Sequence, residues 1–309
     1  MLEHVKWFTD ASKYPTDYAL LLSWPVALAF AAGIAAIAVA YWIQHTIPEP
    51  AIVRSLERFA GYGPLALGLH VAVALLVAAA LGLLFVPSLH VEADDAMGWT
   101  ILVMEAVAGL SILLGLATRA GAAVLALLGV VAMQPFTFEA ILEQVHILGI
   151  AIFLFLIGRG PLSLDRVRGV RPPIRDPLVP AAALTFLRVL MGFGIAYSAL
   201  TEKLLNPALS QALLQAHPAL NVLRPLGVGD PVFVWLAGAT ELAIGLVIVS
   251  GQITRPVMAA GALLFTVSLF YFGWSEVLGH LPFFGIMLLL LIAPNANTWR
   301  ARQALRPAA

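Results

Sequence analysis

The chain has 309 residues, of which 61% are hydrophobic and 11% are charged, and its mean hydropathy is +0.95. Soluble domains carry roughly a quarter of charged residues, so this composition excludes an ordinary soluble protein and predicts an integral membrane protein. The 17 basic residues are balanced by 17 acidic ones and there is no cysteine, which excludes a basic surface for nucleic acid, disulfides and thiolate metal ligands.

The N-terminal part, residues 1–47, is predicted to be a polar segment followed by one transmembrane helix. Residues 1–17 mix Lys6 and Lys13 with acidic residues, unlike the basic start of a cleaved signal. The apolar run near 18–43 exceeds the roughly 20 residues that a membrane-spanning helix needs. We therefore expect this run to span the bilayer.

The rest of the chain is predicted to form two four-helix units. The first covers residues 48–165, and a basic, proline-rich linker at 166–179 joins it to the second unit and its tail at 180–309. Long apolar runs without strand-like alternation favour helices, which satisfy their backbone hydrogen bonds in lipid. The predicted fold is an all-α polytopic membrane protein of about nine transmembrane helices: two tandem four-helix bundle units plus one extra N-terminal helix. The expected spans of the two units lie near 64–86, 98–117, 120–134, 141–157, 180–201, 231–250, 256–273 and 281–293.

An internal repeat supports the prediction of two related units. Glu105 opens the sequence EAVAGLSILLGLATR and Glu241 opens ELAIGLVIVSGQITR, so both fit the frame E-x3-G-x5-G-x2-T-R. In the same register Trp99 matches Trp235, which a shared excess of leucine cannot explain. Because each unit has an even number of spans, we expect an axis along the membrane normal to relate them.

The distribution of charge predicts how the chain crosses the membrane. In the nine-span arrangement most arginines fall on one side, which the positive-inside rule makes cytoplasmic. The N-terminus then lies outside and the C-terminus inside, in a multi-pass protein of the bacterial inner (cytoplasmic) membrane. Lys203 is an exception on the outer side, where residues 203–224 are expected to form an interfacial helix that is interrupted at Pro207 and ends near Pro218.

Two glutamates inside spans are the first candidates for chemistry. An acidic side chain in the centre of a bilayer costs roughly 2.5–3.5 kcal/mol on insertion scales, so Glu105 and Glu241 should face the bundle interior and have polar partners. Each could handle protons or bind a polar headgroup, or could form a structural hydrogen bond, and the sequence favours neither use. Lys203 could pair with Glu241, bind an anionic or carbonyl headgroup, or extend to the membrane interface.

Two pairs of glutamate and histidine are the next candidates. Glu143 and His146 have the Glu-x-x-His spacing of di-iron bundles. The second unit has Glu276 and His280 at i and i+4, close to Trp274. A di-iron site needs further carboxylates and a second Glu-x-x-His, so a polar and aromatic cap at the membrane interface is the favoured interpretation. We predict no metal site.

A set of residues in the second unit also carries a family resemblance. These residues are Arg188, Gly192, Glu202, Lys203, Glu241, Gly245, Gly251, Thr254 and Arg255. Over about 180–293 the chain resembles the DoxX family of bacterial membrane proteins. The first unit repeats part of the pattern, without a counterpart of Lys203, through Glu105, Gly109, Gly115, Thr118 and Arg119. Relatives in that family include the membrane subunit of a thiosulfate:quinone oxidoreductase, so the resemblance implies a redox-linked membrane subunit.

The leading functional hypothesis is an integral membrane subunit of a redox-linked complex, with a quinone as the candidate cofactor. The predicted catalytic residues are Glu241, Lys203 and Glu105, and the predicted residues around the quinone head are Glu143, His146, Glu276, His280 and Trp274. We expect one pocket to contain Glu241, Lys203, Glu276 and His280. We expect a related pocket to contain Glu105, Glu143 and His146. The expected partners are the lipid bilayer, the quinone and a redox partner protein.

Two other classes of function fit the sequence. A transporter or channel for a small solute or a proton would need a continuous polar path to both faces of the membrane, whereas a quinone site needs polar groups only in the outer half. A non-catalytic scaffold would instead recruit a periplasmic partner through the loops at 87–97 and 203–230.

Overall fold

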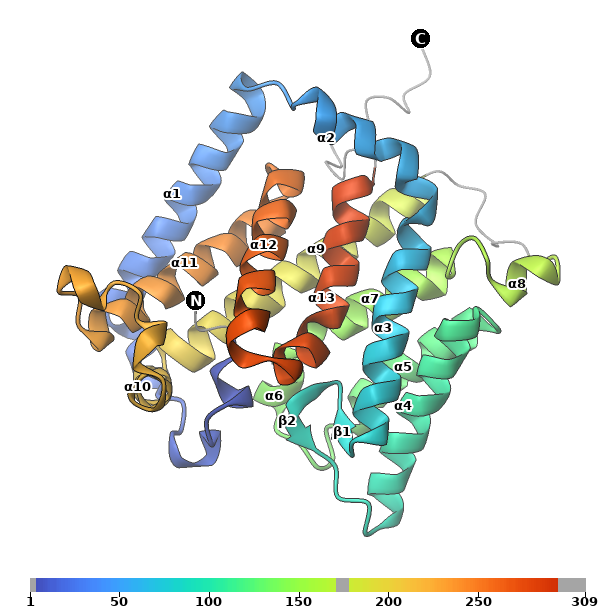
Figure 1. The fold of residues 1–309 in the computed structure, drawn as a ribbon, viewed down its shortest axis with the longest axis horizontal. Coiled ribbons are helices and arrows are strands. Elements are labelled where there is room, and N and C mark those ends of the chain that lie inside the picture. Colours follow the sequence, from blue (N-terminus) through green and yellow to red (C-terminus); the bar gives the residue numbers. More distant parts are fainter. Residues whose placement is uncertain (1–3, 171–177, 294–309) are drawn as a thin grey trace.

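A computed structural model describes residues 4–170 and 178–293, and this part of the chain is helical apart from one short β-hairpin (Figure 1). Within it, seven helical stretches are long and apolar enough to cross a membrane, which is the pattern of a polytopic membrane protein. They are α1 (Trp24–Thr46), Ala51–Ala80, which contains α2 (Ala51–Ser55) and α3 (Gly63–Ala80), α4 (Ala96–Leu114), Pro180–Leu204, which contains most of α9 (Leu178–Ala199), α11 (Asp230–Ser250), α12 (Thr254–Phe272) and α13 (Trp274–Ile292).

Two further apolar helices lie where spans are predicted, but they are shorter. Helix α5 (Thr118–Val131) has 14 residues and α7 (Val145–Ile157) has 13. At a rise of about 1.5 Å per residue, each covers roughly 20 Å of a hydrocarbon core that is about 30 Å thick. A count of nine spans therefore stays a prediction for these two helices.

The expected span at 64–86 ends early, in a hairpin that the sequence did not predict. Helix α3 stops at Ala80, and Gly82 follows with a left-handed φ of 69°, a conformation that glycine adopts without strain. Strand β1 (Leu83–Leu84) then pairs antiparallel with β2 (Val86–His90). This hairpin is a local departure, within the described residues, from the predicted all-α fold.

Two spans have different boundaries near their first residues. The expected span at 141–157 consists of α6 (Phe138–Glu143) and α7, which are separated at Gln144. Helix α13 begins at Trp274, well before the expected residue 281. The glutamate and histidine pairs of both spans therefore lie on ordered helical turns.

The expected interfacial helix at 203–224 is shorter than predicted. A π-helical turn, Leu200–Leu204, continues α9, and α10 covers only Pro207–Ala216. Proline fits the first turn of α10 because the N–H groups there have no partner inside the helix.

The repeated sequence frame produces a repeated turn. Gly115 follows α4 and Gly251 follows α11, both in the left-handed conformation that ends a helix. The arginine of each frame then reaches the end of a later helix: Arg119 donates to the carbonyl of Phe155 in α7, and Arg255 donates to the carbonyl of Ala293 after α13. The shared glycine and arginine thus have the same structural use in both copies.

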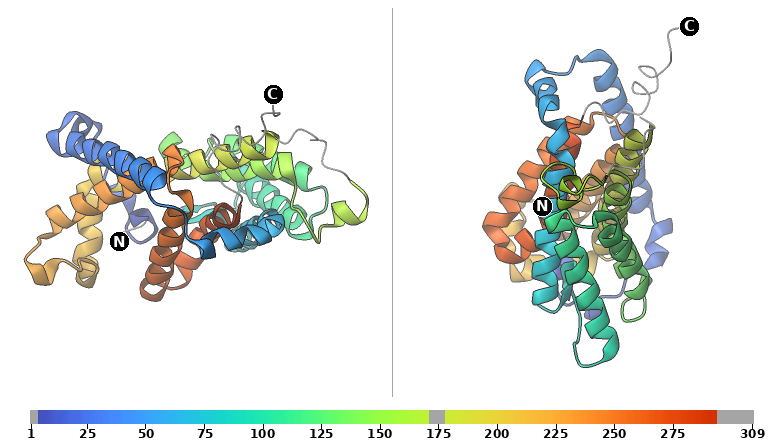
Figure 2. Two further views of the ribbon diagram at one scale, coloured as in Figure 1. Left: turned by 90° about the horizontal axis from the view of Figure 1, so that it is seen from above. Right: turned by 90° about the vertical axis from the view of Figure 1, so that its right-hand side faces the viewer.

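We call the helices of residues 48–165 the first copy of the repeat and those of 180–293 the second. The last helix of each copy packs against the first helix of the other. Helices α3, α4, α5 and α7 pack in chain order, and the last of them, α7, packs against α9. Helix α13 closes the arrangement by packing against α3, while α1 lies outside α11 (Figures 1 and 2). Helix α12 packs on α13 and makes little contact with α11. The second copy is therefore more open than the first, in which α4 and α5 pack closely.

The two ends of the molecule differ in character. We call one the hairpin end, since it contains β1, β2, α6, α10 and the N-terminal residues 4–22 (Figure 1). We call the other the arginine end, since it contains Arg119, Arg159 and Arg255 with α2 and α8 (Leu164–Val167). The apolar core between them includes Val71, Ile150, Leu154, Leu187, Met191, Ile286 and Leu290.

Candidate functional site

The described N-terminal residues fold under the hairpin end in short 3-10 turns. Val5 is fully buried and packs in a cluster with Leu209, Leu213 and Phe233. A backbone hydrogen bond from the Asp17 N–H to the Leu205 carbonyl, 2.9 Å long, holds the far side of the segment. The sequence predicts only a polar segment here, whereas in the structure its described residues form one wall of a buried polar cluster.

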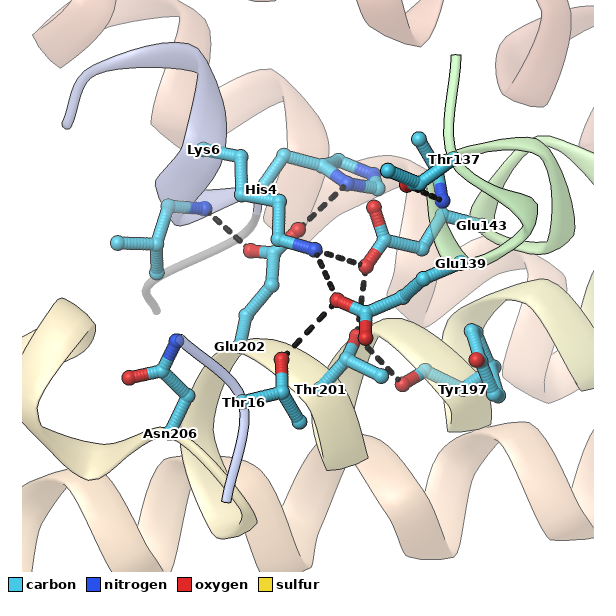
Figure 3. Close-up of polar contacts among 12 residues, drawn as sticks. His4, Lys6, Thr16, Thr137, Glu139, Glu143, Tyr197, Thr201, Glu202 and Asn206 are labelled. Atoms are coloured by element: carbon cyan, nitrogen blue, oxygen red, sulfur yellow. Dashed lines mark hydrogen bonds and ion pairs between the residues drawn. The ribbon is translucent and has the colours of Figure 1, made fainter. Parts of the chain in front are cut away.

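Lys6 lies between two carboxylates of α6. Its Nζ is 2.8 Å from Glu139 Oε1 and 2.5 Å from Glu143 Oε1 (Figure 3). The hydroxyl of Thr201 donates to Glu143 Oε1 at 2.7 Å, and that of Tyr18 donates to Glu139 Oε2 at 2.5 Å. The ammonium and the hydroxyls of Thr16, Tyr18 and Thr201, which come from the N-terminal segment and the end of α9, thus converge on two glutamates.

The charges of this contact support each other. Burial disfavours the charged form of Lys6, but the carboxylates of Glu143, Glu202 and Glu139 outweigh it and raise the pKa of the lysine. Partial burial likewise opposes ionisation of Glu139, yet hydrogen bonds from Lys6 and Tyr18 hold its pKa below the ordinary value. Both groups are therefore charged over the whole physiological pH range.

In the π-helical turn, the consecutive residues Glu202 and Lys203 contact different partners. Glu202 accepts a hydrogen bond from the Val5 N–H at 2.5 Å, and its Oε1 is 3.9 Å from His4 Nδ1. Lys203 Nζ contacts Glu241 Oε2 at 2.6 Å, and both side chains are buried. Pairing with Glu241, one of the uses predicted for Lys203, is present in the structure. A buried ion pair of this kind depends on both of its members.

A layer of histidines and aromatic rings lies beside these pairs. His280 Nδ1 is 2.5 Å from Glu276 Oε2, and neither side chain is exposed to solvent. The His280 ring centroid is 4.1 Å from that of Phe265 and 4.9 Å from that of Trp7. His146, from the first copy, packs its ring 4.1 Å from Phe283. The layer therefore joins side chains of both copies and of the N-terminal segment.

A small cavity borders the cluster between α9, α11, α12 and α13. Its volume is about 40 Å³, and its walls include His4, Ser198 and Glu241 among apolar residues. Glu241 Oε1 and Ser198 Oγ are buried and have no hydrogen-bond partner among the described residues. Since a water needs roughly 10–15 Å³, the cavity has room for a few waters, and it offers them two polar atoms.

The structure brings most of the predicted site residues together. Glu143, His146, Lys203, Glu241, Glu276 and His280 all belong to the buried cluster at the hairpin end. Among the described residues there is no group of three or more histidine, aspartate or glutamate side chains placed to hold a metal ion.

Two predicted site residues lie apart from the cluster. Glu105 is fully buried and accepts a hydrogen bond from the Phe85 N–H of the hairpin at 2.9 Å. No hydrogen bond or ion pair in residues 4–170 and 178–293 joins it to Glu143 or His146, so the second expected pocket is not formed in this way. Trp274 is 60% exposed and faces the surroundings of the molecule.

Sequence reasoning missed the contribution of His4 and Lys6. The segment around them is rich in charged residues, but Val5, Trp7 and Phe8 add an apolar stretch that a solvated tail does not need. Lys6 is also a basic residue on the predicted outer side, where basic residues are scarce. These two features could have indicated that the segment is buried, but neither predicts which residues it contacts.

Comparisons of the chain with protein-family models, with curated proteins and with solved structures found no match in any of the three.

Proposed function

We propose that this chain is a DoxX-like membrane subunit of a redox-linked complex, and that its hairpin end holds the polar head of a quinone-type ligand. The observation that carries this proposal is the pair of buried atoms, Glu241 Oε1 and Ser198 Oγ, that border an apolar cavity without partners in the described chain. Ligand sites typically combine apolar walls with a few polar groups that fix orientation.

The groups around the cavity suit the chemistry of such a head. A quinone would supply the redox chemistry itself. The hydroxyl of Ser198 can donate a hydrogen bond to a carbonyl. Of the four residues expected in one pocket, only Glu241 lines this cavity; outside its wall, the Glu276–His280 pair and the Lys203–Glu241 pair can each hold a proton. The carboxylate of Glu241 could both pair with Lys203 and contact the ligand head. One of its oxygens binds the ammonium, and the other borders the cavity without a partner among the described residues.

We also propose that the hairpin end faces the outside of a bacterial inner membrane and that the arginine end faces the cytoplasm. The positive-inside rule supports this orientation. In the same proposal, residues 48–165 and 180–309 are two units related by an axis along the membrane normal. The repeated turn and the reciprocal packing of α3 on α13 and of α7 on α9 support that relation.

A transporter has less support than a one-sided site. The helical turns that follow the cluster toward the arginine end carry Ile150 and Leu154 on α7 and Ile286 and Leu290 on α13, all buried and apolar. A solute or proton path would need polar groups at these levels.

A scaffold is the second candidate function. It is favoured by a hollow of about 720 Å³ at the hairpin end, bordered by the N-terminal segment, β2 and α6. In that case a partner protein would bind to the outside of the cluster.

Binding of a short-chain quinone analogue to the purified protein tests the quinone proposal. We expect measurable binding that Glu241→Gln and Ser198→Ala each weaken about tenfold, since each removes one polar contact worth roughly 1.4 kcal/mol. Glu92→Gln, in an exposed loop of the hairpin end, is the matched control and should bind like the parent. Equal affinity in folded Glu241→Gln protein would exclude this residue from the site.

A further inference from the structure

We propose that residues 4–22, which we call the N-terminal plug, close the access route from the outer surface to the buried cluster, and that Lys6 is the latch that holds the plug. The proposal deepens the proposed function by naming the route to its site. It is tested without any ligand, so the two can fail separately.

The plug contacts both copies of the repeat at once. Lys6 binds Glu139 and Glu143 of α6, in the first copy, while the Val5 N–H binds Glu202 at the end of α9, in the second. No other described residue pairs a basic side chain with either α6 glutamate. Removal of Lys6 would leave these carboxylates close together without a counter-ion, and like charges in a partly buried site favour the entrance of water.

Two rings of the plug occupy the space directly over the site. His4 lines the cavity beside Glu241, and its ring stacks on that of Trp7 at 4.2 Å. The Trp7 ring lies against Gly279 so closely that a Cβ there would be 2.1 Å from it. The absence of a side chain at Gly279 therefore makes room for the Trp7 ring. Withdrawal of the two rings would enlarge the cavity from the volume of a few waters toward that of a ring-shaped headgroup.

The attachment of the plug is suited to release. Between the anchor at Val5–Trp7 and the start of α1, most residues are exposed or half-exposed, and the chain forms only short 3-10 turns. The anchor combines one buried apolar side chain, that of Val5, with polar contacts of the Lys6 ammonium and the Val5 N–H and with the stack of His4 on Trp7. Segments with few buried apolar contacts open at low free-energy cost compared with the helical core.

A single introduced cysteine can report whether the plug closes the cavity, because the chain has no native cysteine. Ser198→Cys places a thiol in the cavity wall. We would measure its rate of reaction with a polar, membrane-impermeant maleimide in the detergent-purified full chain. In the parent plug we expect slow labelling, and with Lys6→Met we expect a rate at least tenfold higher.

Matched variants separate release of the plug from general damage. Lys13→Met removes a lysine of the same segment whose ion pair is with Asp10 on the surface, and it should label at the parent rate. Gly279→Ala leaves every charge in place but displaces the Trp7 ring, and it should label faster than the parent. Gly129→Ala, on α5, has open space around the new Cβ and should change nothing.

Two results would overturn the proposal. The first is fast labelling with the native plug, which would mean that residues 4–22 do not close the cavity. The second is parent-like labelling in both Lys6→Met and Gly279→Ala proteins that remain monodisperse and retain cooperative melting. If Lys6→Met does not fold, Gly279→Ala decides alone. Quinone binding, measured separately, decides the proposed function whatever the labelling rates are.

Discussion

Glu105 and Glu241 occupy the same position of the repeat but have different environments. Glu105 accepts a hydrogen bond from a backbone N–H, that of Phe85 in the hairpin. Glu241 pairs with the ammonium of Lys203 and keeps one oxygen beside a cavity. The difference arises outside the repeated frame, in the segments that follow α3 and α9. One copy has a hairpin there and the other has a π-helical turn. A shared motif therefore specifies the helix and the turn, while its neighbours decide whether the acid binds a backbone N–H or pairs with a lysine beside a cavity.

The largest effect should come from breaking the ion pair. Glu241→Leu would remove the carboxylate that pairs with the buried Lys203 ammonium, and we expect a loss of about 3–5 kcal/mol in the free energy of unfolding. Thermal melting in detergent measures it. The double variant Lys203→Met/Glu241→Leu should recover a large part of the loss, because it removes the buried ammonium together with the carboxylate. No recovery in the double variant would contradict the importance of the pair.

Replacing Glu105, the corresponding acid of the first copy, should lower the free energy of unfolding by less. Glu105→Leu would leave the buried Phe85 N–H without an acceptor, which typically costs about 1–3 kcal/mol. Glu105→Gln keeps an acceptor oxygen and should melt close to the parent. A Glu105→Leu protein as unstable as Glu241→Leu would show that the two acids are more alike than their partners indicate.

Replacing the glycine that ends α4 or α11 should lower the free energy of unfolding by a similar amount in both copies. Gly115→Ala and Gly251→Ala each place a Cβ on a residue with a left-handed φ, 61° and 77° respectively, which costs about 1–2 kcal/mol. Crowding against Ser163 in one case and Arg188 in the other adds to the cost. Melting of the two variants beside Gly129→Ala checks the symmetry. A neutral effect in only one copy would mean that its turn relaxes.

The smallest effect should be on the pH dependence of plug docking. The lowered pKa of Glu139 means that its contribution is present above the ordinary value of 4.5 and is lost as the pH falls through its lower folded value. The raised pKa of Lys6 means that its contribution is present below 10.5 and is lost only at still higher pH. Glu143, Glu202 and His4 are the other titratable groups that face this contact.

A spin label at Ser12→Cys, on the exposed part of the plug, can follow this response. We expect an immobilised spectrum between pH 5 and 9 and a growing mobile fraction as the pH falls below 4.5. Glu139→Gln should already have a mobile fraction at neutral pH. A spectrum that stays immobilised at pH 3 would mean that apolar contacts of Val5 and Trp7 suffice to hold the plug.

The helices and the repeat could be predicted because their signals are local. Apolar length located the seven helical stretches long enough to cross a membrane, and the repeated frame located Gly115, Gly251 and the buried acids. The charge pattern on neighbouring helices suggested the Lys203–Glu241 pair, since the two helices are adjacent in the chain. The prediction that each buried acid has a polar partner is confirmed.

The plug and the hairpin could not be predicted because they depend on distant contacts. Lys6 meets its glutamates across more than 130 residues of chain, and no sequence period relates them. The hairpin interrupts an apolar run that continues to Val86 without a charge, so hydropathy alone extends the helix. Only the left-handed residues Gly82 and Phe85 turn the chain there.

The packing of α3 against α13 also governs how the protein is assembled in the cell. These two helices are separated by about 200 residues, which a ribosome adds in roughly 10–40 s. During that time the inner face of α3, with Leu67 and Val71, has no α13 to cover it. Lipid, an insertion factor or another chain must occupy that face until synthesis is nearly complete. A polypeptide released before Trp274 would keep the face uncovered, and we expect such fragments to be degraded rather than to accumulate as a stable half.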